Sequence, residues 1–408
     1  MLQLCYRLRA LISSAALLMG ISAVFSLLPF PSFSQEFPAP SRTTTSEKET
    51  KATEDEQEVV MSFEKTVLGV EVTKAIPIAE VIGKVSDKRI VYAGEHHDEY
   101  EDHLVQLEII KGLFAGNKTI SIGMEMFQTP FQKALDDYIA GKMNEREFLK
   151  ASEYFKRWGF DYNLYKDILR FAREKKIPLV ALNMRKEIVD KVSKNGMASL
   201  SEEEKKELPR TMDMTDEDYK KRLREVFETH PDSEDLSFEN FYQSQIIWDE
   251  TMAQSVDDYL GNNPDRQMVV MAGEGHISHG SGIPKRTFRR NGLDYAVVLC
   301  NTSVEKDIAD FVIYPKAEKA PSTPKLGVVL KDDNGRVKIL GFAEKSVAEK
   351  AGLEIDDAIV SLDGEKVGDA DDVRIFLLYK KQGDAVAVNI LRKRFLFGER
   401  ELRFEVTL

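Results

Sequence analysis

The sequence predicts an α/β fold, a largely parallel sheet flanked by helices with an inserted helical lobe, followed by a small, mostly-β domain at the C-terminus. Three observations support this prediction. Apolar runs are short and continuous rather than alternating, which is typical of strands covered on both faces. Helical periodicity fills the segments between these runs. A Pro- and Ala-rich stretch, Lys316–Pro324, separates the last part of the chain from the rest.

Five apolar runs are predicted strands, and four stretches between them carry apolar residues at three- and four-residue steps. The strands are 89–93, 119–124, 178–182, 267–272 and 294–299. The helices are 103–114, 130–139, 145–154 and 164–175. Strands that alternate with helices pair in parallel, because each crossover returns the chain to the same end of the sheet.

Residues 195–235 interrupt this alternation with a charged segment that includes the run from Ser201 to Glu204. Helices are expected there, but they offer little to a core. Two interpretations stay open: a lobe that acts as a lid over a site, or a solvated excursion of the chain. A long amphipathic helix is predicted next, at 238–260.

The N-terminus has the pattern of an export signal. Arg7 and Arg9 precede an apolar stretch at 10–28, and Ser32 and Ser34 place small residues before a cleavage point. We therefore expect a signal peptide at 1–34 and an exported protein, periplasmic or associated with the cell envelope. An uncleaved membrane anchor is the alternative. Residues 35–60 contain little to bury and are expected to be a disordered linker.

Charge and cysteine content exclude some classes of protein. The 408 residues carry a formal net charge of −12, so we expect no nucleic-acid partner. Cys5 precedes the apolar stretch and is not placed to become a lipidated N-terminus. After cleavage only Cys300 remains, which excludes an intramolecular disulfide.

Two predicted strand ends that are far apart in the chain have nearly the same sequence. Residues 91–97 read Val-Tyr-Ala-Gly-Glu-His-His, and residues 270–276 read Val-Met-Ala-Gly-Glu-Gly-His. Ligands in open α/β sheets bind outside the carboxyl ends of the strands. We therefore expect the side chains at these ends to line one shared hollow. The side chains are Glu95, His96, His97, Glu125, Asn183, Glu274 and His276.

Such a set suits a divalent metal ion or a small metal-bearing ligand. Imidazole and carboxylate are ordinary metal ligands, and an open coordination position would activate water. Each residue also has a structural interpretation, because a strand-end histidine or a buried carboxylate often serves only as a hydrogen-bonding partner. His103 would either pack on a helix face or act as a ligand. His230 is expected at the surface, and His279 fits either role.

Gly94-Glu95-His96-His97-Asp98, with His103 beyond, resembles the opening motif of the ChaN-like haem-binding uptake family. The resemblance spans roughly residues 63–315. Further segments that carry it are 124–127, 177–183, 245–249, 252–253, 273–276 and 282–284. The family belongs to a wider group with the erythromycin esterases and the Tiki-type metal-dependent peptidases.

The resemblance implies both a site and a cofactor. Glu95 and Glu125 would be catalytic residues, and His97, His276 and His103 would form a metal or haem site. It also implies haem as cofactor, with a divalent metal ion as the alternative. In the haem-binding branch a tyrosine can hold the iron. The candidates for that ligand are Tyr92, Tyr154, Tyr162, Tyr165 and Tyr242.

The last part of the chain resembles a bacterial PDZ domain of the type attached to exported proteases. Leu326-Gly327-Val328-Val329, the segment 346–353 and Asp363-Gly364 carry the resemblance. It implies that Leu326, Gly327, Val328 and Val329 bind the carboxylate of a protein C-terminus at a sheet edge. The helix beside that groove would be 372–378. Asp357 replaces the glycine usual in this family, a change expected to affect only a loop.

The expected organisation is a signal peptide at 1–34, a linker at 35–60, a ChaN-like domain at 61–315, a second linker at 316–324 and a PDZ domain at 325–408. Three functions follow from it. The first is an exported protein that binds haem or an iron cofactor and docks to a protein C-terminus, involved in iron uptake. The second is a metal-dependent hydrolase or peptidase. The third, a scaffold without chemistry, fits poorly with an intact set of strand-end residues.

Overall fold

A computed structural model describes residues 74–117, 119–229, 237–394 and 398–408. The predicted signal peptide, the first linker and His230 lie outside these residues. No helix in the described part of the chain is both long enough and apolar enough to cross a membrane.

Residues 78–313 form a six-stranded sheet in which every pairing is parallel, as predicted. Its strand order is β3-β2-β4-β1-β5-β6. The strands are β1 (Ile90–Glu95), β2 (Ile120–Gln128), β3 (Leu179–Asn183), β4 (Gln267–Gly273), β5 (Tyr295–Cys300) and β6 (Phe311–Ile313). The side chains of β1 to β4 are all buried, which explains why their sequences do not alternate.

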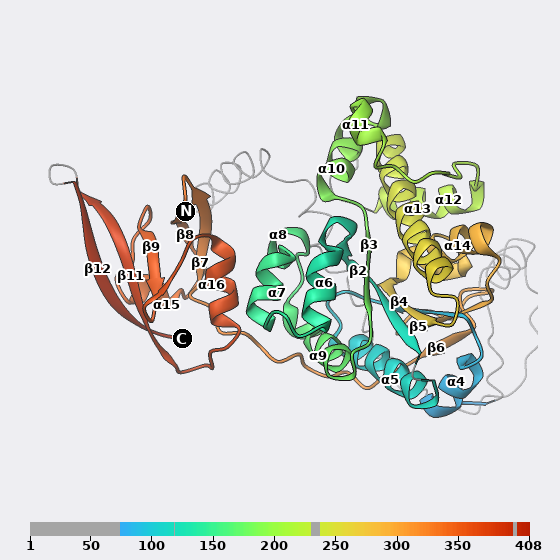
Figure 1. The fold of residues 1–408 in the computed structure, drawn as a ribbon. Coiled ribbons are helices and arrows are strands. Elements are labelled where there is room, and N and C mark those ends of the chain that lie inside the picture. Colours follow the sequence, from blue (N-terminus) through green and yellow to red (C-terminus); the bar gives the residue numbers. More distant parts are fainter. Residues whose placement is uncertain (1–73, 118, 230–236, 395–397) are drawn as a thin grey trace, which may run out of the picture.

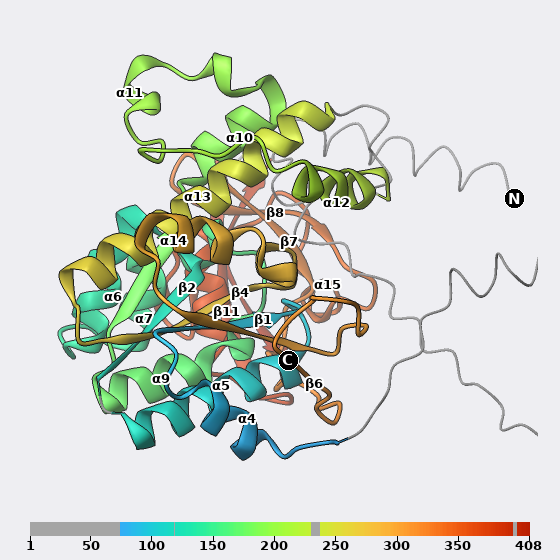
Figure 2. The ribbon, with the colours of Figure 1, turned by 90° about the vertical axis from the view of Figure 1, so that its right-hand side faces the viewer.

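Helices cover both faces of this sheet (Figure 2). One layer packs into a core that includes Val91, Ile122 and Val298. It contains α4 (Ile78–Val85), α5 (Tyr100–Gly116), α6 (Gln132–Ile139), α7 (Glu145–Ala151), α8 (Tyr154–Arg157) and α9 (Lys166–Lys175). The opposite layer contains α13 (Phe238–Asn262) and α14 (Ile283–Asn291), which pack on Tyr92, Val270 and their neighbours.

The charged segment forms the predicted helical lobe. It contains α11 (Glu202–Lys205) and α12 (Glu217–Glu228), and α10 (Lys186–Asn195) leads into it. The lobe packs on α13 through two small apolar clusters, one around Val192 and one around Phe227. The described part of the lobe is therefore attached to the body of the domain rather than being a loose excursion.

The C-terminal domain is an antiparallel sheet of order β12-β11-β9-β8-β7, with β10 paired to β9. Its elements are β7 (Val328–Asp333), β8 (Arg336–Phe342), α15 (Val347–Lys350), β9 (Ala358–Leu362), β10 (Glu365–Lys366), α16 (Ala370–Leu377), β11 (Ala385–Arg394) and β12 (Gly398–Thr407). Asp363 and Gly364 both have positive φ, as a tight two-residue hairpin turn requires. Figure 1 shows this domain beside α7 and α8.

A change of one glycine tests the turn that leads into α14. Gly282 has φ +58°, and an added Cβ would lie 2.2 Å from the backbone oxygen of His276. We expect Gly282→Ala to lower the free energy of unfolding by about 2–4 kcal/mol, because backbone strain and a clash with the main chain add together. Gly275→Ala is the control, since open space surrounds that position. Urea unfolding measures both, and equal stability of the two variants would contradict the prediction.

Candidate functional site

The two segments of similar sequence are neighbours in the sheet. Gly94 pairs with Ala272 and Glu95 pairs with Gly273 where β1 and β4 end. Strand β2 pairs with the other edge of β4 and brings Glu125 to the same place. The carboxyl ends of three strands thus meet at one edge, where an open parallel sheet binds its ligands.

Gly273 allows this close arrangement. A Cβ at this position would lie 2.8 Å from Cε1 and 3.0 Å from Nε2 of His97. The imidazole ring of His97 therefore lies against the backbone of β4, and only glycine leaves room for it.

Glu95 is a buried anchor with three partners. Its side chain is 2% exposed. Oε1 lies 2.9 Å from Nδ1 of His97 and accepts a hydrogen bond of 2.9 Å from the hydroxyl of Tyr165. Oε2 lies 3.1 Å from Nδ1 of His103. Each carboxylate oxygen thus has a histidine beside it, and Glu95 holds the ring of His97 in place.

Burial opposes the ionised form of Glu95, but its histidine neighbours outweigh burial. The charge and hydrogen bond of His103, followed by those of His97, hold the pKa of the Glu95 carboxyl well below its usual range. A carboxylate at Nδ1 draws the ring proton to that nitrogen. In a neutral ring, this arrangement leaves the lone pair on Nε2.

His97 presents this Nε2 atom in an aromatic setting. Its ring centroid lies 4.9 Å from that of Trp158 and 4.8 Å from that of Phe160. The side chain is 25% exposed, and Nε2 has no hydrogen-bond partner among the described residues. His97 can therefore reach a ligand at the edge of the sheet.

His276 forms a second pair of imidazole and carboxylate. Its Nδ1 lies 2.7 Å from Oδ1 of Asp249, and its Nε2 lies 3.6 Å from Oε1 of Glu125. Burial lowers the pKa of His276, but Glu125 and Asp249 outweigh burial and raise it to about 9. His276 is thus a cation at neutral pH.

Asp249 and Glu125 are held from further elements. Asp249 Oδ2 accepts a hydrogen bond of 2.5 Å from the hydroxyl of Tyr219, which belongs to α12 of the lobe. Glu125 Oε2 accepts the backbone N–H of Gly273 at 2.8 Å, and the Asn183 amide donates to the backbone oxygen of Glu125 at 3.1 Å. The lobe therefore supports His276 indirectly.

His103 differs from the expectation that it belongs to the ligand set. It is 1% exposed, and its Nε2 lies 3.2 Å from the backbone oxygen of His97. Its Nδ1 contacts Glu95 and lies 3.2 Å from the amide oxygen of Gln106. Both ring nitrogens have partners in this structure, and through them His103 supports Glu95 and His97.

His96 points to a different set of partners. Its Nδ1 lies 3.0 Å from Asp102 and its Nε2 lies 3.2 Å from Glu274. His279, with φ +59°, has its Nε2 3.9 Å from Glu305. Neither contributes a free nitrogen beside His97.

The five tyrosines considered as iron ligands are all inaccessible. Each is at most 1% exposed, and burial raises the pKa of each phenol. The five are Tyr92, Tyr154, Tyr162, Tyr165 and Tyr242. None of the five phenols is open to solvent in this conformation, so the structure does not single out one of them as the iron ligand.

The described residues contain no group of three or more His, Cys, Asp or Glu side chains with the geometry to hold a metal ion. The structure therefore does not bring His97, His276 and the carboxylates together as a ready metal centre.

Sequence reasoning missed several residues that shape the site. Tyr165 was considered only as an iron ligand, and Asp249 only as part of a motif. Trp158 and Phe160 were not considered. The sequence offered one signal for Asp249: it follows the apolar run Ile246-Ile247-Trp248 in a predicted helix, and an acidic residue buried there needs a charged or hydrogen-bonding partner.

The C-terminal domain has the parts of a peptide groove. Strand β7 is the last in its sheet, so one of its edges has no strand partner among the described residues. Just before it, Gly327 has φ +76°, and an added Cβ would lie 2.8 Å from Cα of Ser346. Helix α16 begins beside this strand, where the Ala370 N–H donates to Asp332 at 2.8 Å.

Comparisons with known families agree with both domains. The family model described as haem-binding uptake, Tiki superfamily, ChaN matches residues 81–287, just over half of the chain. A PDZ domain model matches residues 324–408. Among curated proteins, RETICULATA-RELATED 5, chloroplastic, of Arabidopsis thaliana is 24% identical over 299 residues. The match covers 64% of this chain and 39% of that protein, so the chain spans about two fifths of the relative.

Solved structures with a similar fold include ChaN of Campylobacter jejuni with cofacial haem. It is 17% identical, with a TM-score of 0.49, and the match covers 59% of this chain and 92% of that chain. The PDZ domain of HtrA3 bound to a phage-derived ligand is 14% identical, with a TM-score of 0.17, and the match covers 20% of this chain and 82% of that chain.

The raised pKa of His276 predicts a pH dependence of stability. The folded pKa is about 9, against roughly 6.5 in an unfolded chain. Protonated His276 therefore stabilises the fold fully below about pH 6.5, and this contribution is lost as the pH rises through 9. We expect His276→Gln to be less stable than the wild type at pH 6 and the difference to shrink by pH 10. Urea unfolding across this range measures it, and a difference independent of pH would contradict the prediction.

Proposed function

The chain belongs to the haem-binding uptake family of the Tiki superfamily that includes ChaN, and we propose that its α/β domain binds haem. The haem would lie at the ends of β1, β2 and β4. We further propose that the PDZ domain docks the protein to the C-terminus of a partner. The observation that carries the first proposal is the free Nε2 of His97, beside a Glu95 carboxylate that holds Nδ1 at 2.9 Å.

This arrangement fits haem better than a bare metal ion. A porphyrin supplies four nitrogen ligands to its iron, so the protein need add only one or two, and histidine is a common choice. A carboxylate on the far nitrogen of a ligating histidine fixes its orientation and raises its basicity. A zinc ion would need three or four protein ligands, and the described residues offer no such group.

His97 is the better candidate than His276. His276 is protonated at neutral pH, because Glu125 and Asp249 raise its pKa to about 9, and an imidazolium has no lone pair for iron. The Trp158 and Phe160 rings beside His97 add an apolar surface of the kind that flat aromatic ligands bind.

A hydrolase is the second candidate. The observation that favours it is the Glu125 carboxylate, whose Oε1 lies 3.6 Å from Nε2 of the protonated His276. A carboxylate beside a charged imidazole can move a proton between water and a substrate. Metal content distinguishes this function from haem binding in the experiment below.

We also propose that the protein is exported, on the basis of the signal-like pattern at residues 1–34. Export would place the haem site in the periplasm or at the cell envelope. It would leave the membrane as a partner only through the N-terminal segment.

Hemin titration tests the haem proposal. We expect the purified protein to give a saturable Soret band, and His97→Ala to bind at least about tenfold more weakly. Glu95→Gln should bind about 10–100-fold more weakly, because it removes the partner that orients His97. His279→Ala is the control and should bind like the wild type. Unchanged binding by His97→Ala would reject this residue as the ligand. Stoichiometric zinc, manganese or iron without haem would favour the hydrolase.

Peptide binding tests the PDZ proposal. We expect a fluorescein-labelled peptide that ends in valine with a free carboxylate to bind, and its C-terminal amide to bind at least about tenfold more weakly. Gly327→Ala should weaken the free peptide similarly, since it distorts the loop before β7. Gly341→Ala is the control, because its surroundings are open. Equal anisotropy titrations for acid and amide would contradict carboxylate recognition.

A further inference from the structure

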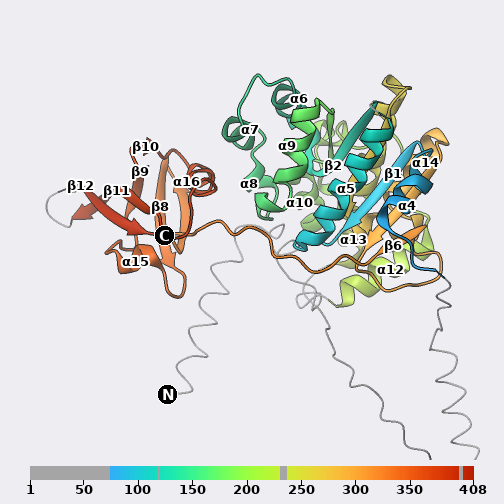
Figure 3. The same ribbon diagram turned by 90° about the horizontal axis from the view of Figure 1, so that it is seen from below.

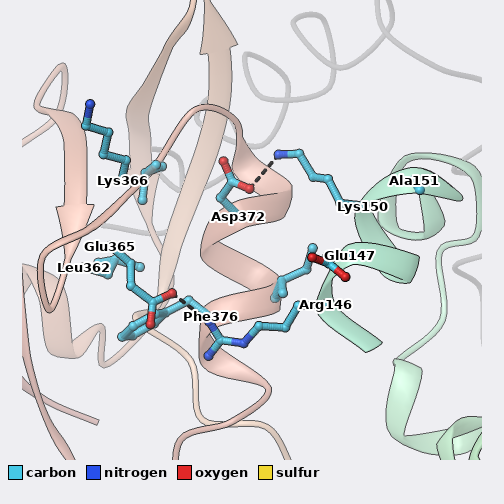
Figure 4. Close-up of a pocket in the computed structure, with 11 residues that line it drawn as sticks. Arg146, Glu147, Lys150, Ala151, Leu362, Glu365, Lys366, Asp372 and Phe376 are labelled. Carbon is cyan, nitrogen blue, oxygen red and sulfur yellow. Dashed lines mark hydrogen bonds and ion pairs between the residues drawn. The ribbon is translucent and has the colours of Figure 1, made fainter. Parts of the chain in front are cut away.

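Helix α16 of the PDZ domain packs against α7 and α8 of the haem-binding domain. Lys150 of α7 lies 2.6 Å from both Asp369 and Asp372. Arg146 lies 2.6 Å from Glu365 of β10. Figure 4 shows Lys150 pointing toward Asp372 and Arg146 pointing toward Glu365. The ends of the contact are therefore ionic.

The middle of this contact is apolar. Ile375 is 6% exposed and belongs to the core cluster of the haem-binding domain, against which Leu378 also packs. Val373 and Phe376, on the opposite side of α16, belong to the PDZ core. One helix is thus shared by the cores of both domains.

The rim of this contact is open to solvent. A cavity of about 430 Å³ lies beside it, with Leu362 and Phe376 on its PDZ side and Arg146 and Lys150 on its α7 side. The ion pairs at its rim are partly exposed, with the Lys150 side chain at 42%. Exposed ion pairs of this kind are individually weak and are screened by salt.

The same contact leads directly to His97. Arg374 of α16 donates a hydrogen bond of 3.3 Å to the backbone oxygen of Phe155 in α8. The Tyr154 hydroxyl, in the same short helix, donates at 3.3 Å to the backbone oxygen of Phe160. Trp158 follows α8 at once, and its backbone N–H donates to the backbone oxygen of Tyr154 at 2.8 Å, so the turn after α8 carries both aromatic rings that contact His97.

We propose that docking of the PDZ domain sets the aromatic surface beside His97: while α16 is docked, α8 keeps Trp158 and Phe160 packed against the imidazole, and separation of the domains loosens both rings. The movement of Trp158 and Phe160 does not depend on which ligand His97 binds. Its biological role rests on the proposed haem function. A partner that pulls on the PDZ domain would thereby alter the surface on which the proposed ligand binds.

Fluorescence of Trp158 tests this proposal without haem. The chain has two tryptophans, so a Trp248→Phe background leaves Trp158 as the only one. The full-length variant that carries both Arg146→Glu and Lys150→Glu places negative charges against Glu365, Asp369 and Asp372. We expect their repulsion to separate the domains. The acrylamide quenching constant of Trp158 should then rise at least about twofold. Lys205→Glu with Lys206→Glu is the control, because it makes the same charge change in α11, away from the contact.

Small-angle X-ray scattering shows whether the two domains have separated in each variant. If the domains separate in the charge-reversal variant and Trp158 quenching stays at the control value, the proposal is overturned. If the domains stay together, Ile375→Asp is added to break the apolar contact. Continued docking of that variant would also overturn the proposal, since the contact would not open. A protein that fails to bind hemin but shows the expected change in Trp158 quenching would reject the haem function and leave the domain coupling supported.

Discussion

A single buried carboxylate, that of Glu95, is the constraint on which the site depends. An ionised carboxyl group away from water is tolerated only when donors surround it. Its donors come from three parts of the chain: His97 follows β1, His103 lies in α5, and Tyr165 precedes α9. Satisfying one charge therefore fixes the ends of three elements relative to one another. It also explains why His103 and Tyr165 are buried although both carry groups that could bind a ligand.

The two imidazole–carboxylate pairs at this edge are alike in geometry and different in electrostatics. Nδ1 of each ring is held by a buried carboxylate, Glu95 for His97 and Asp249 for His276. Glu95 shares its charge among three donors, whereas His276 faces Asp249 on one side and Glu125 on the other. The pKa of the second ring is therefore raised, whereas the first ring has an Nε2 without a hydrogen-bond partner among the described residues. His97 and His276, which occur in nearly identical sequence segments, thus differ in the groups that surround them.

The sequence predicted the sheet, because continuous apolar runs indicate buried strands. It also predicted that strand ends meet, because the Ala-Gly-Glu sequence occurs at two of them. β6 was not predicted, since three half-buried residues make no recognisable pattern. The environment of each side chain could not be predicted either. Helical periodicity says that one face of α5 is buried, but not that the His103 nitrogens would both be occupied there. Nor does it show that Asp249, in α13, would reach His276 across a separation of 27 residues in the chain.

The two-sided burial of α16 is informative about how the domains are joined. A PDZ helix needs apolar residues only on the side that faces its own sheet, which Val373 and Phe376 provide. Ile375 and Leu378 give α16 a second apolar side, and a helix that is apolar on opposite sides packs between two bodies. The surrounding charges, by contrast, stay partly in water, where attraction over a few ångströms is weak and depends on salt. The apolar centre of the contact fixes the position of α16, and its hydrated ion pairs add little further stability. This is the physical combination that a reversible connection to α8 requires.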